Sequence, residues 1–370
     1  MKLFRRFLLF LNLILIFSLL GAYASAFVSP NTFWPFAFLG LAYPYLAFLN
    51  LVFMVVWIFV RWQFAFLSGL ALITGYYFAA GTYQLNPPQG DEKQANDFKV
   101  MSFNVRLFDL YNWSKNKETR KEIIQLIQQE NPDIIAFQEY YSNNDGYHVH
   151  TDSIKEWLGL KFAHTYFTYS LHKKQNWGIA TFSRYPIINK DRVSLDNSRN
   201  NTCIFSDIVV PGNDTFRVYN MHLQSIHLQK EDYKFMEDIQ NDTTEVDELK
   251  GSENILRKLK RAFVKRAIQC DSIASSIRQS KHPVVVCGDF NDTPVSYTYQ
   301  TLSEGLKDGF KESGRGFGKT YNGLLPSMRI DYILHSDVLE GQNFRVIYKK
   351  LSDHFPVVCR LKSRTKEIVP

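Results

Sequence analysis

The apolar positions at the start of the chain form three long runs instead of an alternating pattern. They are Phe7–Val28, Phe36–Val60 and Phe64–Ala80, and none of them contains a charged residue. A helix needs about 20 apolar residues to cross about 30 Å of hydrocarbon. Pro44 interrupts the second run, where a membrane helix tolerates a kink. The pattern therefore predicts about three membrane-spanning helices within residues 1–82.

Beyond residue 97 the pattern changes to short apolar runs, rich in Val, Ile and Phe, that are separated by polar turns. Such runs predict strands. The expected strands are Lys99–Val105, Ile134–Gln138, Gly178–Phe182, Cys203–Val210, Phe216–Leu223, Val284–Cys287, Ile330–Leu334 and Val357–Cys359. Glu118–Gln129 and Glu253–Gln279 repeat apolar residues at helical spacing. We expect residues 98–364 to form one α/β domain of packed sheets with outer helices, after a polar linker at 83–97.

The distribution of charge gives the apolar segment an orientation. No acidic residue precedes Asp91, and the only cations before it are Lys2, Arg5, Arg6 and Arg61. By the positive-inside rule, the N-terminus and the turn at Arg61 are cytoplasmic. After three crossings, the large domain lies outside the cytoplasm, at a cell membrane that the chain crosses several times.

A cleaved signal peptide is the alternative for the first apolar run. The run follows a short basic segment, and Ala24-Ser25-Ala26 resembles a signal-peptidase site. The two remaining runs would then enter and leave the membrane. In both cases the large domain is expected on the outer side.

Charge and cysteine content narrow the chemistry only slightly. The formal net charge is +7, but four cations lie in the apolar segment, so the domain itself is weakly basic. Several Lys and Arg residues in the expected helix at 253–279 form either a basic face for anionic lipid or nucleic acid or a solvated surface. Cys203, Cys270, Cys287 and Cys359 lack the spacing of a zinc site and are expected to be buried free thiols, with a disulfide as the alternative if the domain lies outside the cytoplasm.

Polar residues occur where the predicted strands end. They are Asn104, Glu139, His222, Asp289, Asn291, Asp331, Asp353 and His354. Residues two apart in an extended chain face the same side, so Asp289 and Asn291 can point into one site while Phe290 points into the core. Carboxylate and amide oxygens suit Mg²⁺, or Mn²⁺, much better than zinc. Each motif alone is also typical of an ordinary turn, but the ordered set indicates a metal-dependent site.

This ordered set resembles the endonuclease/exonuclease/phosphatase superfamily. The resemblance covers about Phe98–Leu361 and is carried by Gly-Asp-Phe-Asn at 288–291, Arg-Ile-Asp-Tyr at 329–332 and Ser-Asp-His-Phe-Pro-Val at 352–357. Gly178–Pro186 is similar to the central strand of that family. The resemblance implies a four-layered α/β sandwich, with two packed mixed sheets between helices, and hydrolysis of a phosphodiester or phosphomonoester by water.

The resemblance also implies roles for the residues at the strand ends. Glu139, with Asn104 and Asp353, holds the metal. Asp289 and Asn291 orient the nucleophile and the phosphate, while Asp331 and His354 form a carboxylate–imidazole pair. His222 binds phosphate or protonates the leaving group, and Asn104 and Asn291 also contact phosphate. Either His354 or Asp289 is the general base.

The sequence leaves the substrate open, because the loops around a shared core set specificity. The alternatives are an external nuclease, a hydrolase of phospholipid, inositol phosphate or sphingomyelin, and a sensor that binds a phosphate ligand without catalysis. Gln224–Lys250 is expected to be an insertion that shapes specificity or a loop without consequence. The expected partners are the phosphoester substrate and the membrane, and no obligate protein partner is inferred.

One motif is set aside. Residues 313–320, Ser-Gly-Arg-Gly-Phe-Gly-Lys-Thr, resemble a phosphate-binding P-loop, but Ser313 stands where that motif requires Gly and no apolar strand precedes it. A glycine-rich loop is expected there instead. The aromatic residues Trp177, Phe317 and Tyr321 either stack on bases or belong to the core.

Overall fold

The computed structural model describes residues 2–90, 96–144, 150–195, 201–226, 231–232, 235, 248–323 and 328–364. The chain divides into two compact units. The helical unit comprises Met1–Thr82, Ser225–Ile268 and Asp292–Thr301, and the sheet unit comprises Tyr83–Gln224, Gln269–Asn291 and Leu302–Pro370. Most of the segment 224–250, where an insertion was expected, lies outside the described residues, as does 91–95 of the expected linker.

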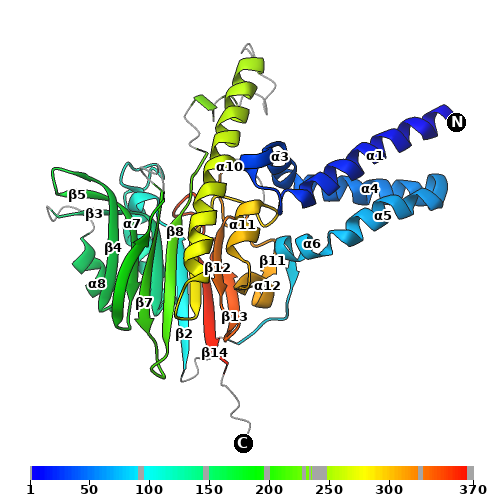
Figure 1. Cartoon of the computed structure of the whole chain (residues 1–370). Coiled ribbons are helices and arrows are strands. Elements are labelled where there is room, and N and C mark those ends of the chain that lie inside the picture. The colour runs from blue at the N-terminus through cyan, green and yellow to red at the C-terminus, as the bar shows by residue number, and fades with distance from the viewer. Residues whose placement is uncertain are drawn as a thin grey trace, which may run out of the picture. The chain divides into compact units, whose positions relative to one another are not determined.

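The N-terminal part of the helical unit is a set of apolar helices (Figure 1). They are α1 (Lys2–Ala24), α2 (Pro30–Phe33), α3 (Pro35–Leu41), α4 (Tyr43–Arg61), the 3₁₀ turn η1 (Trp62–Phe64), α5 (Ala65–Thr74) and α6 (Tyr76–Thr82). Among the described residues, two helical stretches are long and apolar enough to cross a membrane: Lys2–Ala24 and Tyr43–Thr74. The second stretch contains a non-helical residue, Arg61 (φ −167°, ψ 92°), and there turns back so that α4 and α5 lie side by side.

Two of the expected spans are divided by local chemistry. The second breaks at Ala42, and Pro44 lies in the first turn of α4, where its missing N–H costs no helical hydrogen bond. The third breaks at Gly75 into α5 and α6. A Cβ on Gly75 would meet the Tyr23 hydroxyl at 2.0 Å, so the close approach of α1 requires glycine there.

Two six-stranded sheets form the sheet unit. The first sheet runs in the order β13 (Leu339–Val346), β14 (Val357–Ser363), β2 (Asp97–Asn104), β3 (Ile134–Asn143), β5 (Gln175–Ser183) and β4 (Phe162–Leu171). The second sheet runs in the order β10 (Lys307–Asp308), β12 (Asp331–His335), β9 (Val284–Asp289), β8 (Thr215–His222), β7 (Thr202–Val209) and β6 (Ile187–Val193). The pairs β2–β3 and β8–β9 are parallel and the others antiparallel, so both sheets are mixed.

Helices cover the outer faces of both sheets, which makes four layers. On the first sheet, Met101 and Phe103 of β2 pack against Ile123 and Ile127 of α7 (Thr119–Glu130). On the second sheet, Tyr219 of β8 hydrogen-bonds through its hydroxyl to Ser276 of α10 (Glu248–Arg278), at 3.1 Å. The expected α/β sandwich is confirmed.

The remaining elements are short. They are the 3₁₀ turn η2 (Arg106–Asp109), α8 (Thr151–Leu158), α11 (Tyr297–Leu302), α12 (Gly309–Ser313) and a separate ribbon of β1 (Gln84–Leu85) with β11 (Arg315–Gly316). The expected glycine-rich loop thus forms the end of α12 and β11. The four cysteines are free and buried, as expected.

Alternation along the strands decides which polar residues meet. Phe98 and Val100 of β2 and Val285 and Cys287 of β9 lie in the core between the sheets. Continuing every second residue brings Asn104 to the end of β2 and Asp289 to the end of β9 on these same inner faces. The core between the sheets therefore ends in a polar cluster.

Candidate active site

All eight polar residues of the ordered set lie close together, at the ends of five strands and in the segment that precedes β14. Asn104 follows from β2, Glu139 from β3, His222 from β8, Asp289 and Asn291 from β9, Asp331 from β12, and Asp353 and His354 from the approach to β14. The first sheet thus supplies one half of the site and the second sheet the other half. Every predicted site residue lies in this cluster.

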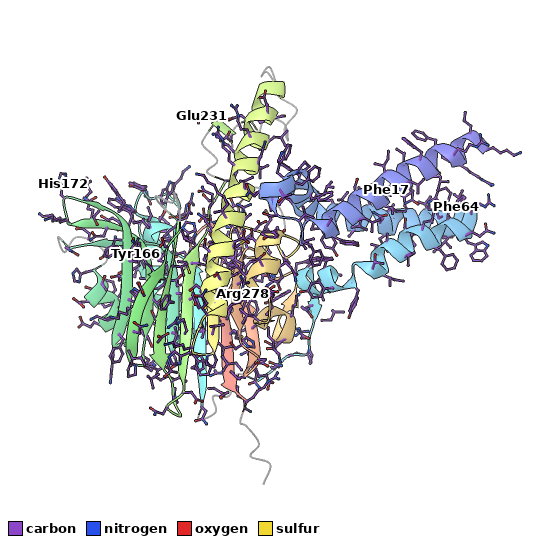
Figure 2. All side chains as sticks on the ribbon, viewed as in Figure 1. Phe17, Phe64, Tyr166, His172, Glu231 and Arg278 are labelled. Atoms are coloured by element: carbon purple, nitrogen blue, oxygen red, sulfur yellow. The ribbon has the colours of Figure 1, made fainter. Side chains whose placement is uncertain are left out.

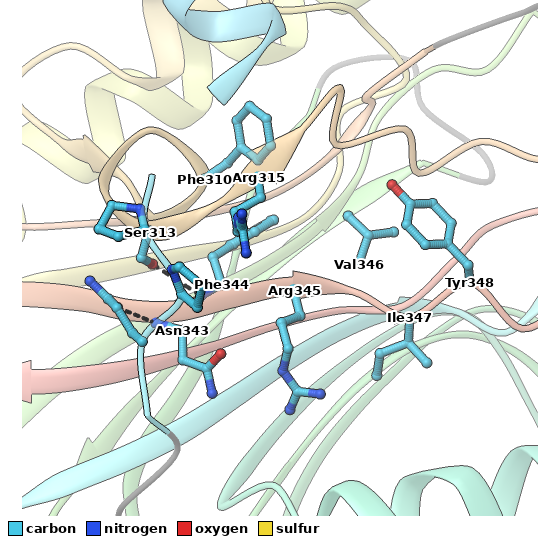
Figure 3. A pocket seen from close by; sticks show the side chains of 12 residues that line it. Phe310, Ser313, Arg315, Asn343, Phe344, Arg345, Val346, Ile347 and Tyr348 are labelled. Atoms are coloured by element: carbon cyan, nitrogen blue, oxygen red, sulfur yellow. Dashed lines mark hydrogen bonds between the residues drawn. The ribbon is translucent and has the colours of Figure 1, made fainter. Parts of the chain in front are cut away.

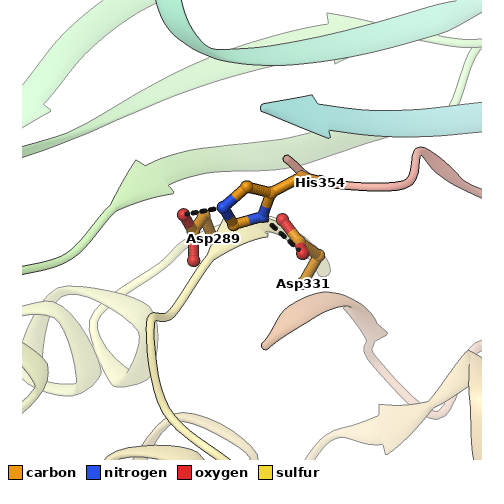
Figure 4. Close-up of side chains that lie close together, drawn as sticks. All are labelled: Asp289, Asp331 and His354. Atoms are coloured by element: carbon orange, nitrogen blue, oxygen red, sulfur yellow. Dashed lines mark hydrogen bonds and ion pairs between the residues drawn. The ribbon is translucent and has the colours of Figure 1, made fainter. Parts of the chain in front are cut away.

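At the centre lies the buried imidazole of His354, between two carboxylates (Figure 4). Nδ1 is 2.9 Å from Asp331 Oδ2, and Nε2 is 3.6 Å from Asp289 Oδ2. Burial alone would lower the pKa of His354, but the charges of Asp331 and Asp289 outweigh it and hold the pKa well above its ordinary value. The geometry matches the predicted carboxylate–imidazole pair.

Asp289 is almost completely buried, and both of its carboxylate oxygens accept hydrogen bonds from the protein. Oδ1 accepts the backbone N–H of Asn291 at 2.8 Å, and Oδ2 accepts from Asn104 Nδ2 at 3.1 Å. Burial raises the pKa of this carboxyl group to about 6, against the opposing effect of His354. The preceding Gly288 has φ 145°, and a Cβ there would lie 2.1 Å from the Met221 carbonyl oxygen. Only glycine allows β9 to approach β8 so closely before the site.

Glu139 and Asp353 form a second acidic corner. Glu139 adopts φ 46° beside a register shift in β3, which turns its side chain toward the site. The side chain is only partly exposed, and this burial raises the pKa of its carboxyl group, which the Asp353 carboxylate raises further. A carboxyl group whose pKa is raised by a neighbouring carboxylate is suited to share a cation with it.

His222 and Asn291 complete the set. His222 Nε2 lies 3.8 Å from Glu139 Oε1 and 3.7 Å from Asp289 Oδ2, so it faces both acidic groups. Asn291 has φ 53°, and its Nδ2 donates to the Leu223 carbonyl at 3.0 Å. The backbone there turns under the site instead of continuing β9.

The donor chemistry fits a hard divalent cation. Asp331 Oδ1 is buried without a hydrogen-bond partner among the described residues. Single ligand atoms of Asp289, Asp331 and His354 lie within 4.8 Å of one another. His354 Nδ1 is already bonded to Asp331, whereas the carboxyl groups of Glu139 and Asp353 offer hard oxygens that could hold a cation. Asn104 turns its amide nitrogen toward Glu139 (3.4 Å) and Asp289, so the carbonyl oxygen would reach a cation only after the amide rotates.

Three supporting residues escaped the sequence analysis. Ser352 Oγ donates to the Asn104 carbonyl at 2.8 Å, across 248 positions in sequence. Arg106 places Nε 3.4 Å from Asp353 Oδ2 and its guanidinium 4.7 Å from the Trp113 ring centroid. Thr320 Oγ1 accepts the N–H groups of Ile330 and Asp331 at 3.0 and 3.1 Å. Arg106 lies two residues after Asn104, and Ser352 precedes Asp353 in the quoted motif, so adjacency offered a signal for these two but not for Thr320.

A polar network joins the two sheets behind the site. Gln138 Nε2 donates to Asn220 Oδ1 at 2.8 Å, and Asn220 Nδ2 donates to the Ala180 carbonyl at 3.0 Å. Gln138 and Asn220 are fully buried. Since buried polar groups are costly unless paired, this network fixes how the sheets align.

The three aromatic residues that were considered for base stacking have different surroundings. Trp177 packs against Tyr141 and Tyr169, with ring centroids 5.2 and 5.3 Å apart. Tyr321 packs edge to face on His354 at 5.5 Å. Phe317 is 58% exposed. Tyr321 therefore belongs to the site, whereas Phe317 lies on the surface.

The structure of the sheet unit is shared with several solved proteins. A protein named endonuclease/exonuclease/phosphatase from Beutenbergia cavernae DSM 12333 is 17% identical and covers 72% of both chains, with a TM-score of 0.52. The mannosyl-6-phosphatase of Bacteroides thetaiotaomicron VPI-5482 is 17% identical over 72% of this chain and 99% of its own, with a TM-score of 0.52. The human Nocturnin catalytic domain, solved with a bound sulfate anion, is 18% identical over 73% and 94%, with a TM-score of 0.51. These likenesses show the fold.

Sequence comparison assigns the two parts of the chain separately. No curated protein matches the chain. Residues 5–82 match a family described as a domain of unknown function (DUF8431). Residues 101–354, which contain every residue of the site, match the family described as Endonuclease/Exonuclease/phosphatase family. The chain therefore belongs to the endonuclease/exonuclease/phosphatase family.

Proposed function

We propose that the protein is a divalent-metal-dependent phosphoester hydrolase that residues 1–82 anchor in a membrane. The observation that carries the proposal is the buried Asp331–His354 pair, with His354 Nε2 facing Asp289. A carboxylate that accepts from one imidazole nitrogen fixes the tautomer and raises the basicity of the other. Such a pair serves proton transfer at a reacting phosphate.

Glu139 and Asp353 would hold the cation, with Asn104 as a third ligand once its amide is rotated. Their hard oxygens favour Mg²⁺ or Mn²⁺. A bound divalent cation would supply positive charge against the negative charge that develops on the phosphoryl oxygens.

The chain's own residues divide the remaining work. Asp289, held by Asn291 N–H and Asn104 Nδ2, accepts the proton of the attacking water. His354, kept as an imidazolium ion by its two carboxylates, binds a phosphoryl oxygen and stabilises the anionic Asp289. His222 protonates the leaving oxygen from the Glu139 side of the site.

The membrane anchor is supported by the distribution of polar groups among the N-terminal helices. Large apolar side chains point outward, including Phe17 (69% exposed; Figure 2) and Phe59 (84% exposed). The buried side chains include Asn12, whose amide bonds Ser68 Oγ (2.7 Å) and Trp57 Nε1 (2.9 Å). These bonds tie α1 to α4 and α5, which favours retention of α1 over its removal as a signal peptide.

These same bonds support the expected orientation. Asn12 lies six residues after Arg6, and its partner Trp57 lies four residues before Arg61, so the N-terminal cations and Arg61 lie toward the same end of the helix set. The positive-inside rule makes this end cytoplasmic. Since α5 and α6 lead away from Arg61, the sheet unit is proposed to lie outside the cytoplasm.

The test of the catalytic proposal uses the full chain in lipid nanodiscs with bis(p-nitrophenyl) phosphate and p-nitrophenyl phosphate. We expect hydrolysis of at least one substrate with Mg²⁺ or Mn²⁺ and loss of it in EDTA. Glu139→Gln should need far more cation for the same rate, and His172→Ala, an exposed residue of the β4–β5 turn, should match the wild type. Equal rates in EDTA, or no hydrolysis with either cation, would overturn the proposal.

A further inference from the structure

Residues 83–89, which follow the N-terminal helices, are held by hydrogen bonds and side-chain contacts within the sheet unit. Only Tyr83 separates α6 from β1, and β1 pairs with β11 through Gln84–Gly316 and Leu85–Arg315. Asn86 Nδ2 then donates to the carbonyls of Lys311 and Gly314, at 3.2 and 3.0 Å. Gln89 Oε1 accepts the N–H of Asn343 at 2.8 Å (Figure 3). Residues 83–89 are therefore a fixed attachment.

The attachment lies on the loop that supports the active site. β11 belongs to the glycine-rich stretch 313–320, in which Gly316 and Gly318 take φ 71° and 58°. Two residues after Gly318, Thr320 accepts the N–H of Asp331 through its hydroxyl group and the N–H of Phe355 through its carbonyl (2.7 Å). The stretch that resembles a P-loop thus joins the attachment to the Asp331–His354 pair.

The β1–β11 ribbon has one apolar and basic face. Partners across an antiparallel pair share a face, as do residues two apart along a strand. Leu85 and Arg315 therefore share a face, and beside them the rings of Tyr83 and Phe317 pack with their centroids 4.9 Å apart. Leu85 is 81%, Phe317 58% and Tyr83 44% exposed, and Arg315 is exposed as well.

This face continues toward the end of β13. A pocket of about 480 Å³ is lined by Pro87, Arg315 and Tyr348, among others (Figure 3). Tyr348 is 61% exposed, and the next two residues, Lys349 and Lys350, are exposed cations. We call the whole set the ribbon surface: Tyr83, Leu85, Arg315, Phe317, Tyr348, Lys349 and Lys350. It contains aromatic, aliphatic and basic residues and no acidic one.

We propose that the ribbon surface rests on an anionic lipid bilayer and that the active site hydrolyses a phosphoester carried by a lipid head group. This rests on the proposed function. Aromatic rings favour the membrane–water interface, and cations are attracted to anionic lipids. α6 is apolar, and only Tyr83 separates it in sequence from β1. A bilayer that holds α6 therefore lies within reach of the ribbon surface. The loop that supports Asp331 and His354 then lies beside the head groups.

The first test measures contact with lipid. The native cysteines are buried, so a thiol-reactive fluorophore labels an introduced Leu85→Cys selectively. The matched control is Ile188→Cys, a residue 62% exposed on the edge strand β6. In nanodiscs of phosphatidylcholine and phosphatidylglycerol, doxyl-labelled lipids should quench the label at position 85 and leave the label at 188 unaffected. Equal quenching by aqueous iodide at both positions would overturn the proposal.

The second test measures the substrate. Full-length protein in nanodiscs is given a phosphatidylinositol phosphate in the same bilayer, or soluble bis(p-nitrophenyl) phosphate and plasmid DNA. We expect Leu85→Asp and Phe317→Ser each to lower kcat/KM for the lipid about tenfold, with the soluble diester unchanged. Ile188→Ser should change neither, and melting temperatures of all variants verify folding.

The outcomes separate the two proposals. Hydrolysis of the soluble diester or DNA without hydrolysis of the lipid would overturn this inference and leave the proposed function standing. Equal losses on lipid and soluble substrate in both ribbon variants would also overturn it. No hydrolysis of any substrate, with either cation, would overturn the proposed function itself.

Discussion

The N-terminal helices and the sheet unit place polar and apolar groups in opposite ways. In the sheet unit Phe98, Ile134 and Val285 are fully buried, and charged groups gather where the strands end. Among the helices, Phe17 and Phe59 point outward, while Asn12 and Asn50 are fully buried. A chain that folded in water alone would not expose so much contiguous apolar surface. The difference supports the proposed membrane anchor, and each half should respond to substitution according to the solvent proposed for it.

The largest expected effect is on catalysis, at the strand ends where the sheet unit buries the charged groups of the site. Asp331→Asn removes the carboxylate that orients His354 and stabilises its positive charge, so kcat should fall about a thousandfold. The pKa of His354 should fall as well, which a pH–rate profile would detect. Asp337→Asn, an exposed residue just beyond β12, serves as the control. A rate within a few fold of the wild type would remove this pair from the mechanism.

The next effect concerns a neutral imidazole buried between the sheets. His164 Nδ1 lies 3.0 Å from Ser206 Oγ, and burial together with Lys190 lowers the pKa of His164 to about 4 from 6.5. Between pH 6.5 and pH 4, His164 binds a proton in the unfolded chain but remains neutral in the folded chain. The free energy of unfolding should therefore fall by about 3 kcal/mol as the pH drops from 6.5 to 4. Denaturant titration of the full chain in detergent should show this loss, and His164→Gln should lack it.

A matched pair of outward-facing residues tests the two solvents directly. Phe17→Arg should oppose membrane insertion by about 2.5 kcal/mol, because the proposed anchor exposes this position to lipid. Ile188→Arg, at a similarly exposed site on β6, should change stability by less than about 0.5 kcal/mol. Carbonate extraction of membranes, followed by immunoblotting, measures the fraction inserted. If both variants remain equally inserted, the helices do not face lipid at Phe17.

The smallest expected effect is inside the helix set. Asn12→Leu leaves Ser68 and Trp57 without their partner and should destabilise the packing of α1 on α4 and α5 by about 1 kcal/mol. Thermal unfolding in detergent micelles measures the change. Asn12→Gln is the companion variant, since it keeps the amide and should recover part of the loss. A more stable Asn12→Leu protein would mean that this interior behaves like an ordinary apolar core.

The sequence predicted most of the central strands and missed the edges. The sequence shows β2, β5, β7, β8 and β9 as apolar runs because both faces of these strands are largely buried. β4, β6 and β13, which were not predicted, are all edge strands. β6 reads Ile-Ile-Asn-Lys-Asp-Arg-Val and is largely exposed, so no apolar run marks it.

The site was predicted where chemistry is local in sequence and missed where it depends on long-range contacts. Asp289 and Asn291 lie in one short motif, and so do Asp353 and His354. Ser352 acts on Asn104 and Thr320 on Asp331, and no spacing rule connects such pairs before the fold is known. The orientation of the Asn104 amide, whose nitrogen faces Glu139, likewise depends on the assembled site.

The placement of β14 has a consequence for the order in which the protein becomes active during synthesis. This strand, Val357–Ser363, is the last strand in the part of the chain that the structure describes, yet it pairs with β2 in the interior of the first sheet, just after Asp353 and His354. A ribosome-bound chain therefore lacks this interior strand and the site residues Asp353 and His354 until residues 353–363 have left the ribosome. A chain cut before β14 should lack the proposed activity even if the N-terminal helices have formed.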